Sequence, residues 1–254
     1  MLRAALALAV AACLAGCGAS DRPTTPDGAV TGDVTVFAAA SLTEVFTALG
    51  KGFETAHPGT RVRFNFAGSS ALARQITEGA PADVFASAAP ATMQQVVDAG
   101  AVTAPPVVFA RNRLQIAVPR GNPGKVTGLA DFARPEAVVA LCAEQVPCGA
   151  AAKKAFEAAG VTPRPDTLEQ DVKAVLTKVR LGEADAALVY RTDVRSAGGD
   201  VEGIEFPEAD RAVNDYPIAP PAKAPNAAGA TAFVAYVRSD AGRAALAGAG
   251  FDGP

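Results

Sequence analysis

The chain has 254 residues, of which 50% are hydrophobic and 19% are charged, and its formal net charge is -3. This length allows one large domain or two lobes of ordinary size, with enough apolar residues for a sizeable core. The small negative charge argues against a nucleic-acid-binding protein, which usually carries a basic face, and means that any anion site must be built locally.

The N-terminal residues 1–17, MLRAALALAVAACLAGC, have the pattern of an export signal. An arginine near the start is followed by an apolar run that is too short to span a bilayer. The closing LAGC resembles the bacterial lipoprotein signal box, which implies that Cys17 becomes the lipid-carrying first residue of the mature chain. A plain signal peptide that happens to end in cysteine is the alternative. Residues 18–32 are small, polar and rich in Pro and Gly, so we expect a flexible linker.

Beyond this linker, the hydrophobic pattern alternates between strand and helix periodicity. Residues 34–39 are an apolar run typical of a buried strand, and SLTE at residues 41–44 matches a capping box for a helix that runs past residue 53. The same criteria predict strands at residues 61–66, 83–86, 114–118, 138–141, 186–190 and 216–219, and helices at residues 70–78, 93–97, 150–159, 171–181 and 230–246. Such alternation predicts an α/β fold with mostly parallel sheets flanked by helices.

Two cysteines fall within the predicted folded part, Cys142 and Cys148, in the string LCAEQVPCG. In an exported protein such a near pair can form a disulfide, which would close a short loop and stabilise the fold modestly. Two free buried thiols, or half of a metal site, are the alternatives. The single histidine of the chain makes a metal site a weak hypothesis, because the further Cys or His ligands are missing.

Four junctions between a strand and a helix carry small or polar residues. Ser41 opens one helix, Gly68-Ser69-Ser70 the next, Pro147-Cys148-Gly149 a third, and residues 169–172 a fourth. In open α/β sheets these junctions lie at the carboxyl ends of strands, where ligands bind. A helix start also offers unpaired N–H groups and the positive end of the helix dipole, which suit an anion.

The strings TVFAAASLTE and FNFAGSSALARQITEGAPADVFASA, followed by EQVPCG, EQDVKAVL and ALVYRTD, resemble the periplasmic molybdate-binding proteins of ABC importers. The resemblance runs from about Val34 to near the C-terminus. It implies a two-lobed periplasmic-binding-protein fold with the ligand cleft between the lobes. We therefore expect one lobe from residues 33–112 and 215–254, and a second from residues 113–214.

Carried over position by position, the resemblance implies an oxyanion site without a cation. The serines would offer hydroxyl and N–H donors from the first lobe, and the second lobe would offer two backbone N–H groups and a phenol. The family commonly has a small residue such as Ala where this chain has Cys148, but a backbone donor does not depend on its side chain. The implied binding residues are Ser41, Ser69, Cys148, Val172 and Tyr190.

Each of these residues has another interpretation when it is taken alone. The serines could be only helix caps, Val172 could be a core residue, and Tyr190 could be an aromatic at the end of a strand. The neighbouring Lys173 and Arg191 are expected to point to solvent.

The sequence thus predicts an extracytoplasmic protein, anchored to the membrane by lipid on Cys17, that captures molybdate for an ABC permease and its ATPase. Tungstate, nearly the same size, should bind too. We expect a monomer that needs no cofactor and no metal beyond the oxyanion, and that is not an enzyme. Sulfate or another tetrahedral oxyanion is the alternative ligand, and a partner-binding lipoprotein is an alternative class. A serine hydrolase is remote, because AGSSAL lacks the G-x-S-x-G pattern and His57 is the only histidine.

Overall fold

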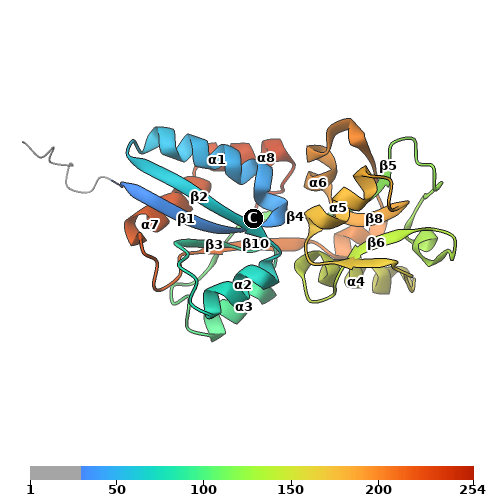
Figure 1. Cartoon of the computed structure of the whole chain (residues 1–254), viewed down its shortest axis with the longest axis horizontal. Helices are drawn as coiled ribbons and strands as arrows, with labels where there is room; N and C mark the ends of the chain where they lie inside the picture. Colours follow the sequence, from blue (N-terminus) through green and yellow to red (C-terminus); the bar gives the residue numbers. More distant parts are fainter. Residues whose placement is uncertain (1–29) are drawn as a thin grey trace, which may run out of the picture.

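The computed structural model describes residues 30–254, which form two α/β lobes lying side by side (Figure 1). The predicted export signal, Cys17 and most of the predicted linker lie outside the described residues. The first strand begins at Gly32, the last residue assigned to the linker, and the N–H of Gly32 donates to the carbonyl of Gly59 at 2.8 Å. None of the helices within residues 30–254 has the length and apolar character needed to cross a membrane.

The first lobe is built on a five-stranded sheet of order β2-β1-β3-β10-β4. Strand β10 is antiparallel to both of its neighbours, so it is the one reversed strand among four that run the same way. The strands are β1 (Gly32–Ala39), β2 (Thr60–Ala67), β3 (Val84–Ala86), β4 (Val107–Asn112) and β10 (Asn214–Ala219), and the helices are α1 (Thr43–Ala56), α2 (Ser69–Thr77), α3 (Pro90–Asp98), α7 (Ala227–Val237) and α8 (Asp240–Ala249).

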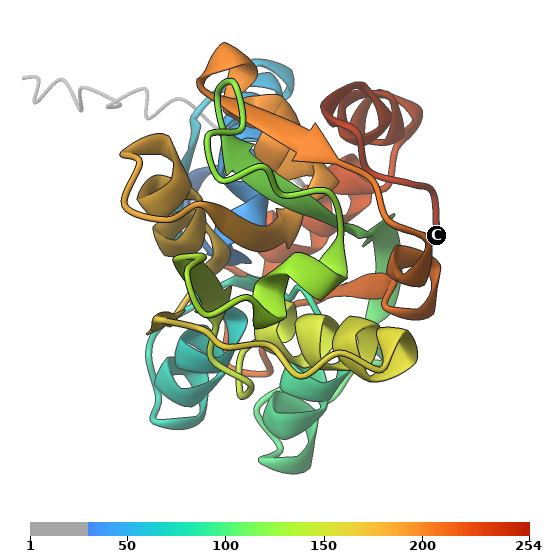
Figure 2. The ribbon, with the colours of Figure 1, turned by 90° about the vertical axis from the view of Figure 1, so that its right-hand side faces the viewer.

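The second lobe repeats this plan with the order β7-β6-β8-β5-β9, in which β5 is the one reversed strand (Figure 2). Both sheets are therefore mostly parallel, which confirms the predicted fold class. The strands are β5 (Leu114–Pro119), β6 (Val139–Cys142), β7 (Thr167–Glu169), β8 (Ala186–Tyr190) and β9 (Val201–Ile204), the helices are α4 (Pro147–Ala159), α5 (Val172–Arg180) and α6 (Arg191–Ser196), and short 3-10 helices occupy Ala40–Leu42, Leu129–Ala133, Gly198–Asp200 and Pro207–Arg211.

The chain crosses between the sheets twice, once from β4 to β5 and once from β9 to β10. The predicted lobe limits, at residues 112/113 and 214/215, lie close to these crossings. The exact division of the chain into two lobes stays a prediction. Two crossings join the lobes and leave the rest of the interface between them free to open, as a hinge requires.

Separate apolar cores explain why each lobe packs as a unit. In the first lobe, the apolar face of α1 brings Phe46 and Phe53 against Phe233 of α7, with ring centroids 6.0 and 5.3 Å apart. In the second, Phe132 and Phe156 meet edge to face at 5.3 Å. Such aromatic pairs add about 0.5–1.5 kcal/mol beyond the area that they bury.

The strands β4, β7 and β9 and the helix α6 were not predicted, and two further features of the secondary structure differ from the prediction. The helix expected at residues 230–246 is two helices, because Ser239 caps α8, with its Oγ accepting from the N–H of Gly242 at 3.2 Å. The expected capping box at residues 41–44 is absent from the described structure: a 3-10 turn precedes α1, and Thr43 Oγ1 donates to the carbonyl of Ala40 at 2.6 Å.

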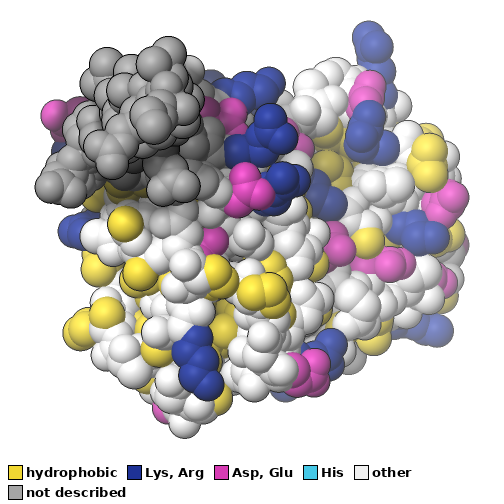
Figure 3. Space-filling model, turned by 60° about the vertical axis from the view of Figure 1, so that its left-hand side comes forward, with side chains coloured by type: hydrophobic (Ala, Val, Ile, Leu, Met, Phe, Trp, Pro, Cys, Tyr) yellow, Lys and Arg dark blue, Asp and Glu magenta, His cyan; other side chains and the backbone are white. Residues whose placement is uncertain are grey.

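The surface of the first lobe carries both signs of charge. On the face shown in Figure 3, Lys and Arg side chains are interspersed with Asp and Glu, and hydrophobic side chains are scattered among uncharged atoms. Among the described residues on this face, the Lys and Arg side chains do not form a continuous basic stripe of the kind that binds nucleic acid.

Candidate ligand-binding site

Four helix starts meet at a small cavity between the two lobes. The cavity has a volume of about 20 Å3, slightly more than the roughly 10–15 Å3 that one water molecule needs. All five residues that the resemblance implied are brought together there. The lining consists of Ala39, Ala40, Ser41, Gly68, Ser69 and Ala88 from the first lobe, and Val146, Pro147, Cys148, Asp171, Val172 and Tyr190 from the second.

Strand register explains this convergence. In the first sheet Ala39 of β1 pairs with Ala67 of β2, so the two parallel strands end side by side and their following helices begin at one edge. In the second sheet Cys142 of β6 pairs with Glu169 of β7, and the loops after them lead to α4 and α5. Because ends of parallel strands share an edge, residues far apart in sequence become neighbours at the cleft.

Ser69 presents a hydroxyl whose hydrogen is free for a ligand. Its side chain is buried, with 1% exposed, and its Oγ accepts from the N–H of Ala88 at 3.0 Å. That bond uses a lone pair and leaves the O–H hydrogen available. The N-cap of α2 is Gly68, and no side chain caps this helix, so the interpretation of Ser69 as a mere cap is wrong.

Ser41 lies in the 3-10 turn between β1 and α1. Its Oγ is 2.9 Å from Oη of Tyr216, a fully buried phenol on β10. The side chain of Ser41 makes no capping bond at either helix start, which also rules out the cap interpretation. Burial raises the pKa of Tyr216 above its ordinary value, so this phenol keeps its proton and can donate to Ser41. Ser41 is then free to donate its own hydrogen into the cavity.

Cys148 offers its backbone N–H from the first turn of α4, where the helix supplies no acceptor. A disulfide joins it to Cys142 at the end of β6, with the two Cα atoms 5.7 Å apart. The next residue, Gly149, has no room for a side chain, since a Cβ there would lie 2.0 Å from the carbonyl oxygen of Ala143. The short PCG motif therefore holds the start of α4 tightly against the strand.

Val172 is the first residue of α5, and its N–H has no intrahelical acceptor. The N-cap Asp171 accepts through Oδ1 from the N–H groups of Lys173 and Ala174, both at 2.9 Å, and leaves the N–H of Val172 unused. The Val172 side chain is buried in the core, as the alternative interpretation expected, while its backbone lines the cavity.

Tyr190 ends β8 and is 1% exposed. Its Oη accepts from Nδ2 of Asn214 at 2.8 Å, and the other hydrogen of that amide goes to the carbonyl of Ala88 at 2.7 Å. Burial raises the pKa of Tyr190 well above its ordinary value, with a smaller contribution from Tyr216. The phenol therefore remains a donor at physiological pH.

The lobes touch around the cavity through contacts that sequence analysis did not predict. Ser70 Oγ donates to the carbonyl of Gln145 across the cleft at 2.6 Å. A Cβ on Gly68 would lie 2.2 Å from the carbonyl oxygen of Gln170, so glycine permits the close approach. Asp171 also lines the cavity, and its place before an apolar helical repeat was the available signal for its capping role.

The expectation that Lys173 and Arg191 point to solvent is wrong. Lys173 Nζ lies 2.9 Å from Glu44 Oε1 of the other lobe. Arg191 donates to the carbonyl of Gly250 at 2.6 Å and to Asp252 Oδ1 at 2.9 Å. Both side chains therefore make contacts between the lobes. For Arg191 this follows because the segment around Asp252 pairs with β4 of the first lobe.

The arrangement suits a small, fully ionised anion. The donors at the cavity are N–H and O–H groups at the positive ends of helices, and no Lys, Arg or His is among the described lining residues. The described residues also contain no cluster of three metal-ligating side chains. His57 packs on Phe53 at the end of α1, with ring centroids 4.4 Å apart, and is not part of the lining.

Comparison with known proteins places the chain. The family model described as bacterial extracellular solute-binding protein matches residues 34–252. The molybdate-binding protein ModA of Mycobacterium tuberculosis is 43% identical over 243 residues, which cover 95% of this chain and 93% of that protein. Molybdate-binding protein ModA of Escherichia coli is 34% identical over 201 residues, or 74% and 77% of the two chains.

The same fold is present in the periplasmic molybdate-binding protein of Azotobacter vinelandii, with a TM-score of 0.76, 19% identity, and coverage of 87% of this chain and 99% of that chain. The family match spans most of the sequence and agrees with the two-lobed fold and its cleft. The chain belongs to the bacterial extracellular solute-binding protein family.

Proposed function

We propose that this protein captures molybdate in the cleft between its lobes and delivers it to the permease and ATPase of an ABC importer. Its 43% identity to a mycobacterial protein named as molybdate-binding supports this ligand. The observation that carries the proposal is the convergence of donors from both lobes on one cavity. A ligand held from both sides is enclosed when the lobes close and released when they part.

We assign the contacts by lobe. Ser41 and Ser69 donate through their hydroxyls from the first lobe, and Cys148, Val172 and Tyr190 complete the cage from the second. Each hydrogen bond to a charged group contributes roughly 1.5–3 kcal/mol. About six such bonds supply on the order of 10 kcal/mol before ordering costs, which corresponds to micromolar-to-nanomolar affinity.

The donor set favours a fully ionised oxyanion over a protonated one. Hydrogen phosphate carries a proton that needs an acceptor, and the one carboxylate among the described lining residues, Asp171, already accepts two N–H groups through Oδ1. Sulfate is a tetrahedral dianion like molybdate but smaller, so discrimination between them rests on the size of the closed cavity. Tungstate matches molybdate in size and charge, and we propose that it binds equally.

We further propose that a lipid on Cys17 anchors the protein outside the cytoplasm, with residues 18–32 as the linker. The protein works as a monomer without a cofactor, and its lobes, residues 33–112 with 215–254 and residues 113–214, move about the two crossings. Replacing Cys17 with serine should release the protein from the membrane fraction into the soluble fraction. Continued incorporation of a labelled fatty acid by that variant would contradict the anchor.

Calorimetry on the chain from residue 18 onward, titrated with molybdate, tungstate, sulfate and phosphate, tests the ligand. We expect saturable binding of the first two and weak or absent binding of the others. Saturable sulfate or phosphate binding with no response to molybdate would overturn the assignment. If no oxyanion raises the melting temperature, a partner-binding lipoprotein becomes the better hypothesis, because a tight ligand must stabilise the folded state.

A further inference from the structure

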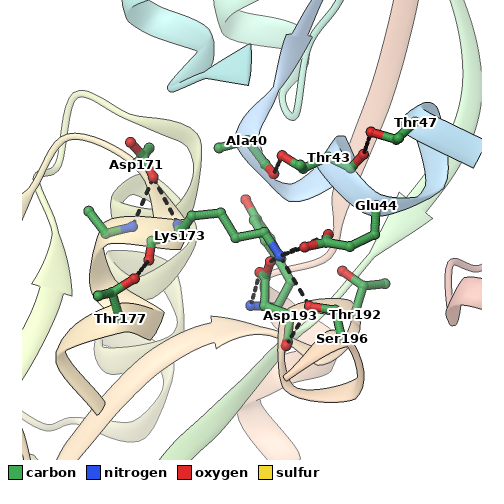
Figure 4. A network of polar contacts seen from close by, with 12 residues as sticks. Ala40, Thr43, Glu44, Thr47, Asp171, Lys173, Thr177, Thr192, Asp193 and Ser196 are labelled. Atoms are coloured by element: carbon green, nitrogen blue, oxygen red, sulfur yellow. Dashed lines mark hydrogen bonds and ion pairs between the residues drawn. The ribbon is translucent and has the colours of Figure 1, made fainter. Parts of the chain in front are cut away.

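An ion pair spans the cleft beside the cavity (Figure 4). Glu44 lies in the first turn of α1 and Lys173 in the first turn of α5, 129 residues apart in sequence. Nζ of Lys173 is 2.9 Å from both carboxylate oxygens of Glu44. The Lys173 side chain is 24% exposed and that of Glu44 is 53% exposed, so solvent reaches the pair from the Glu44 side and shields the Lys173 end less.

Lys173 is also held by its own lobe. Its Nζ lies 3.1 Å from Oδ1 of Asp193, a carboxylate with no exposed area, and 3.1 Å from Oγ of Ser196. Oδ1 of Asp193 makes no hydrogen bond within the described residues, which leaves the ammonium as its partner. Because the burial of a lone carboxylate is costly, Asp193 keeps Lys173 in place even when Glu44 moves away.

The same groups support two of the proposed ligand donors. Lys173 directly follows Val172, whose N–H lines the cavity, and its own N–H is fixed by the N-cap Asp171. Asp193 accepts through Oδ2 from the N–H of Tyr190 at 3.1 Å. Across the cleft, Glu44 lies three residues after Ser41. The ion pair therefore joins the two backbone segments that carry the donors of opposite lobes.

We propose that Lys173 and Glu44 form a latch that holds the cleft closed over the bound oxyanion and slows its release. Lys173 acts as a positioning residue, since it contacts the opposite lobe and not the ligand. Asp193 already holds the Lys173 ammonium in position before the lobes close. Closure therefore has to fix only the side chain of Glu44. The identity of the ligand in this inference rests on the proposed function. The effect of the ion pair on closure of the lobes does not depend on which ligand binds.

A different role for Lys173 would be that of a distant counter-ion for the oxyanion. The two roles predict opposite effects of Glu44→Gln. Removing a negative charge near a bound anion should strengthen binding if only the electrostatic field matters. Removing one half of a latch should weaken binding and speed release.

The test is stopped-flow dissociation of molybdate from Glu44→Gln, Lys173→Met and the double variant. We expect each single variant to release molybdate about three- to tenfold faster than wild type, as for a partly buried charged pair. The double variant should be no faster than Lys173→Met, because both changes break the same contact. Lys178→Met is the matched control: it lies on the same helix and pairs with Glu183 of its own lobe at 2.8 Å. It should release molybdate at the wild-type rate.

Fluorescence energy transfer between dyes attached at position 51 in α1 and position 157 in α4 measures the distance between the lobes. Both Lys51 and Glu157 are exposed, and the measurement does not depend on ligand release. In ligand-free protein, Glu44→Gln and Lys173→Met should shift the distance between the lobes to longer values than wild type and Lys178→Met. If wild type binds no molybdate, the proposed function fails while this distance still tests the latch. Unchanged distance and release relative to Lys178→Met, or tighter binding by Glu44→Gln, would overturn the latch.

Discussion

The two lobes line one cavity with different kinds of donor. The first lobe presents side-chain hydroxyls, Ser41 and Ser69, each supported by a neighbouring polar group. The second presents mainly backbone N–H groups, held by the disulfide at Cys148 and by the Asp171 cap before Val172, together with the single phenol of Tyr190. A side-chain donor can be removed by one substitution, whereas a backbone donor can be changed only through what positions it. The lobes should therefore respond to mutation in different ways.

The largest expected effect on molybdate binding is that of Gly68→Ala, which should prevent closure without changing the first lobe itself. Its backbone, with φ -58° and ψ 133°, accepts any residue, so the first lobe should fold normally. The added Cβ would lie 2.2 Å from the carbonyl oxygen of Gln170 and keep the second lobe from closing. Loss of two or more charged hydrogen bonds predicts molybdate affinity reduced by about 100-fold or more, measured by calorimetry.

Gly248→Ala provides the control for Gly68→Ala, because that position lies in α8 with open space around it. It should bind molybdate like wild type. Wild-type affinity for Gly68→Ala would mean that the lobes do not need this close approach. A large fall in its ligand-free melting temperature would mean that the change damages the first lobe itself.

Removing the hydroxyl donors of the first lobe should give the next largest effect. We expect Ser69→Ala and Ser41→Ala each to weaken molybdate binding by about 1–3 kcal/mol in calorimetry. Each change also removes the hydrogen-bond partner of a buried group, the N–H of Ala88 or the phenol of Tyr216, so both should lower the ligand-free melting temperature slightly. Near-neutral effects of both would show that the first lobe binds through backbone groups, like the second.

The disulfide tests the second lobe. Replacing Cys142 and Cys148 with serine removes a disulfide that closes a short loop, with a sequence separation of 6 residues. The free energy of unfolding should fall by about 2 kcal/mol. The N–H of residue 148 remains, so molybdate affinity should fall only severalfold. A reducing agent should weaken binding by wild type and leave the double variant unchanged. Loss of binding as severe as in Gly68→Ala would mean that α4 does not start at the cavity without its bridge.

Much of this site could be predicted because it depends on local pattern. A strand followed by a small residue and an apolar helical repeat marks each junction at Ser41, Ser69, Cys148 and Val172. Their ligand role came from resemblance, since several of them read alone as caps or core. The contacts of Lys173, Gly68 and Gln145 could not be predicted, because they exist only where lobes formed by distant segments meet. The capping box at residues 41–44 failed because a 3-10 turn makes Leu42, and not Ser41, the N-cap of α1, and Glu44 instead pairs with Lys173 of the other lobe.

The two lobes also differ in the surroundings of their buried carboxylates. Asp83 of the first lobe accepts from two backbone N–H groups, those of Thr35 at 2.7 Å and Asn226 at 2.6 Å. Asp193 of the second accepts from one N–H and faces Lys173. Burial raises the pKa of Asp193 from 3.8 to about 6, against the opposing effect of Lys173.

The raised pKa of Asp193 predicts a pH dependence of stability. Between pH 4 and 6 the folded state binds more protons at this carboxyl than the unfolded state, so this carboxyl contributes stability that grows as the pH falls through that window. Relative to Asp193→Asn, wild type should gain about 1–3 kcal/mol in free energy of unfolding between pH 7 and pH 4. Urea denaturation of the ligand-free proteins at several pH values measures this difference. Parallel profiles for the two proteins would show that Lys173 fully compensates the buried charge of Asp193.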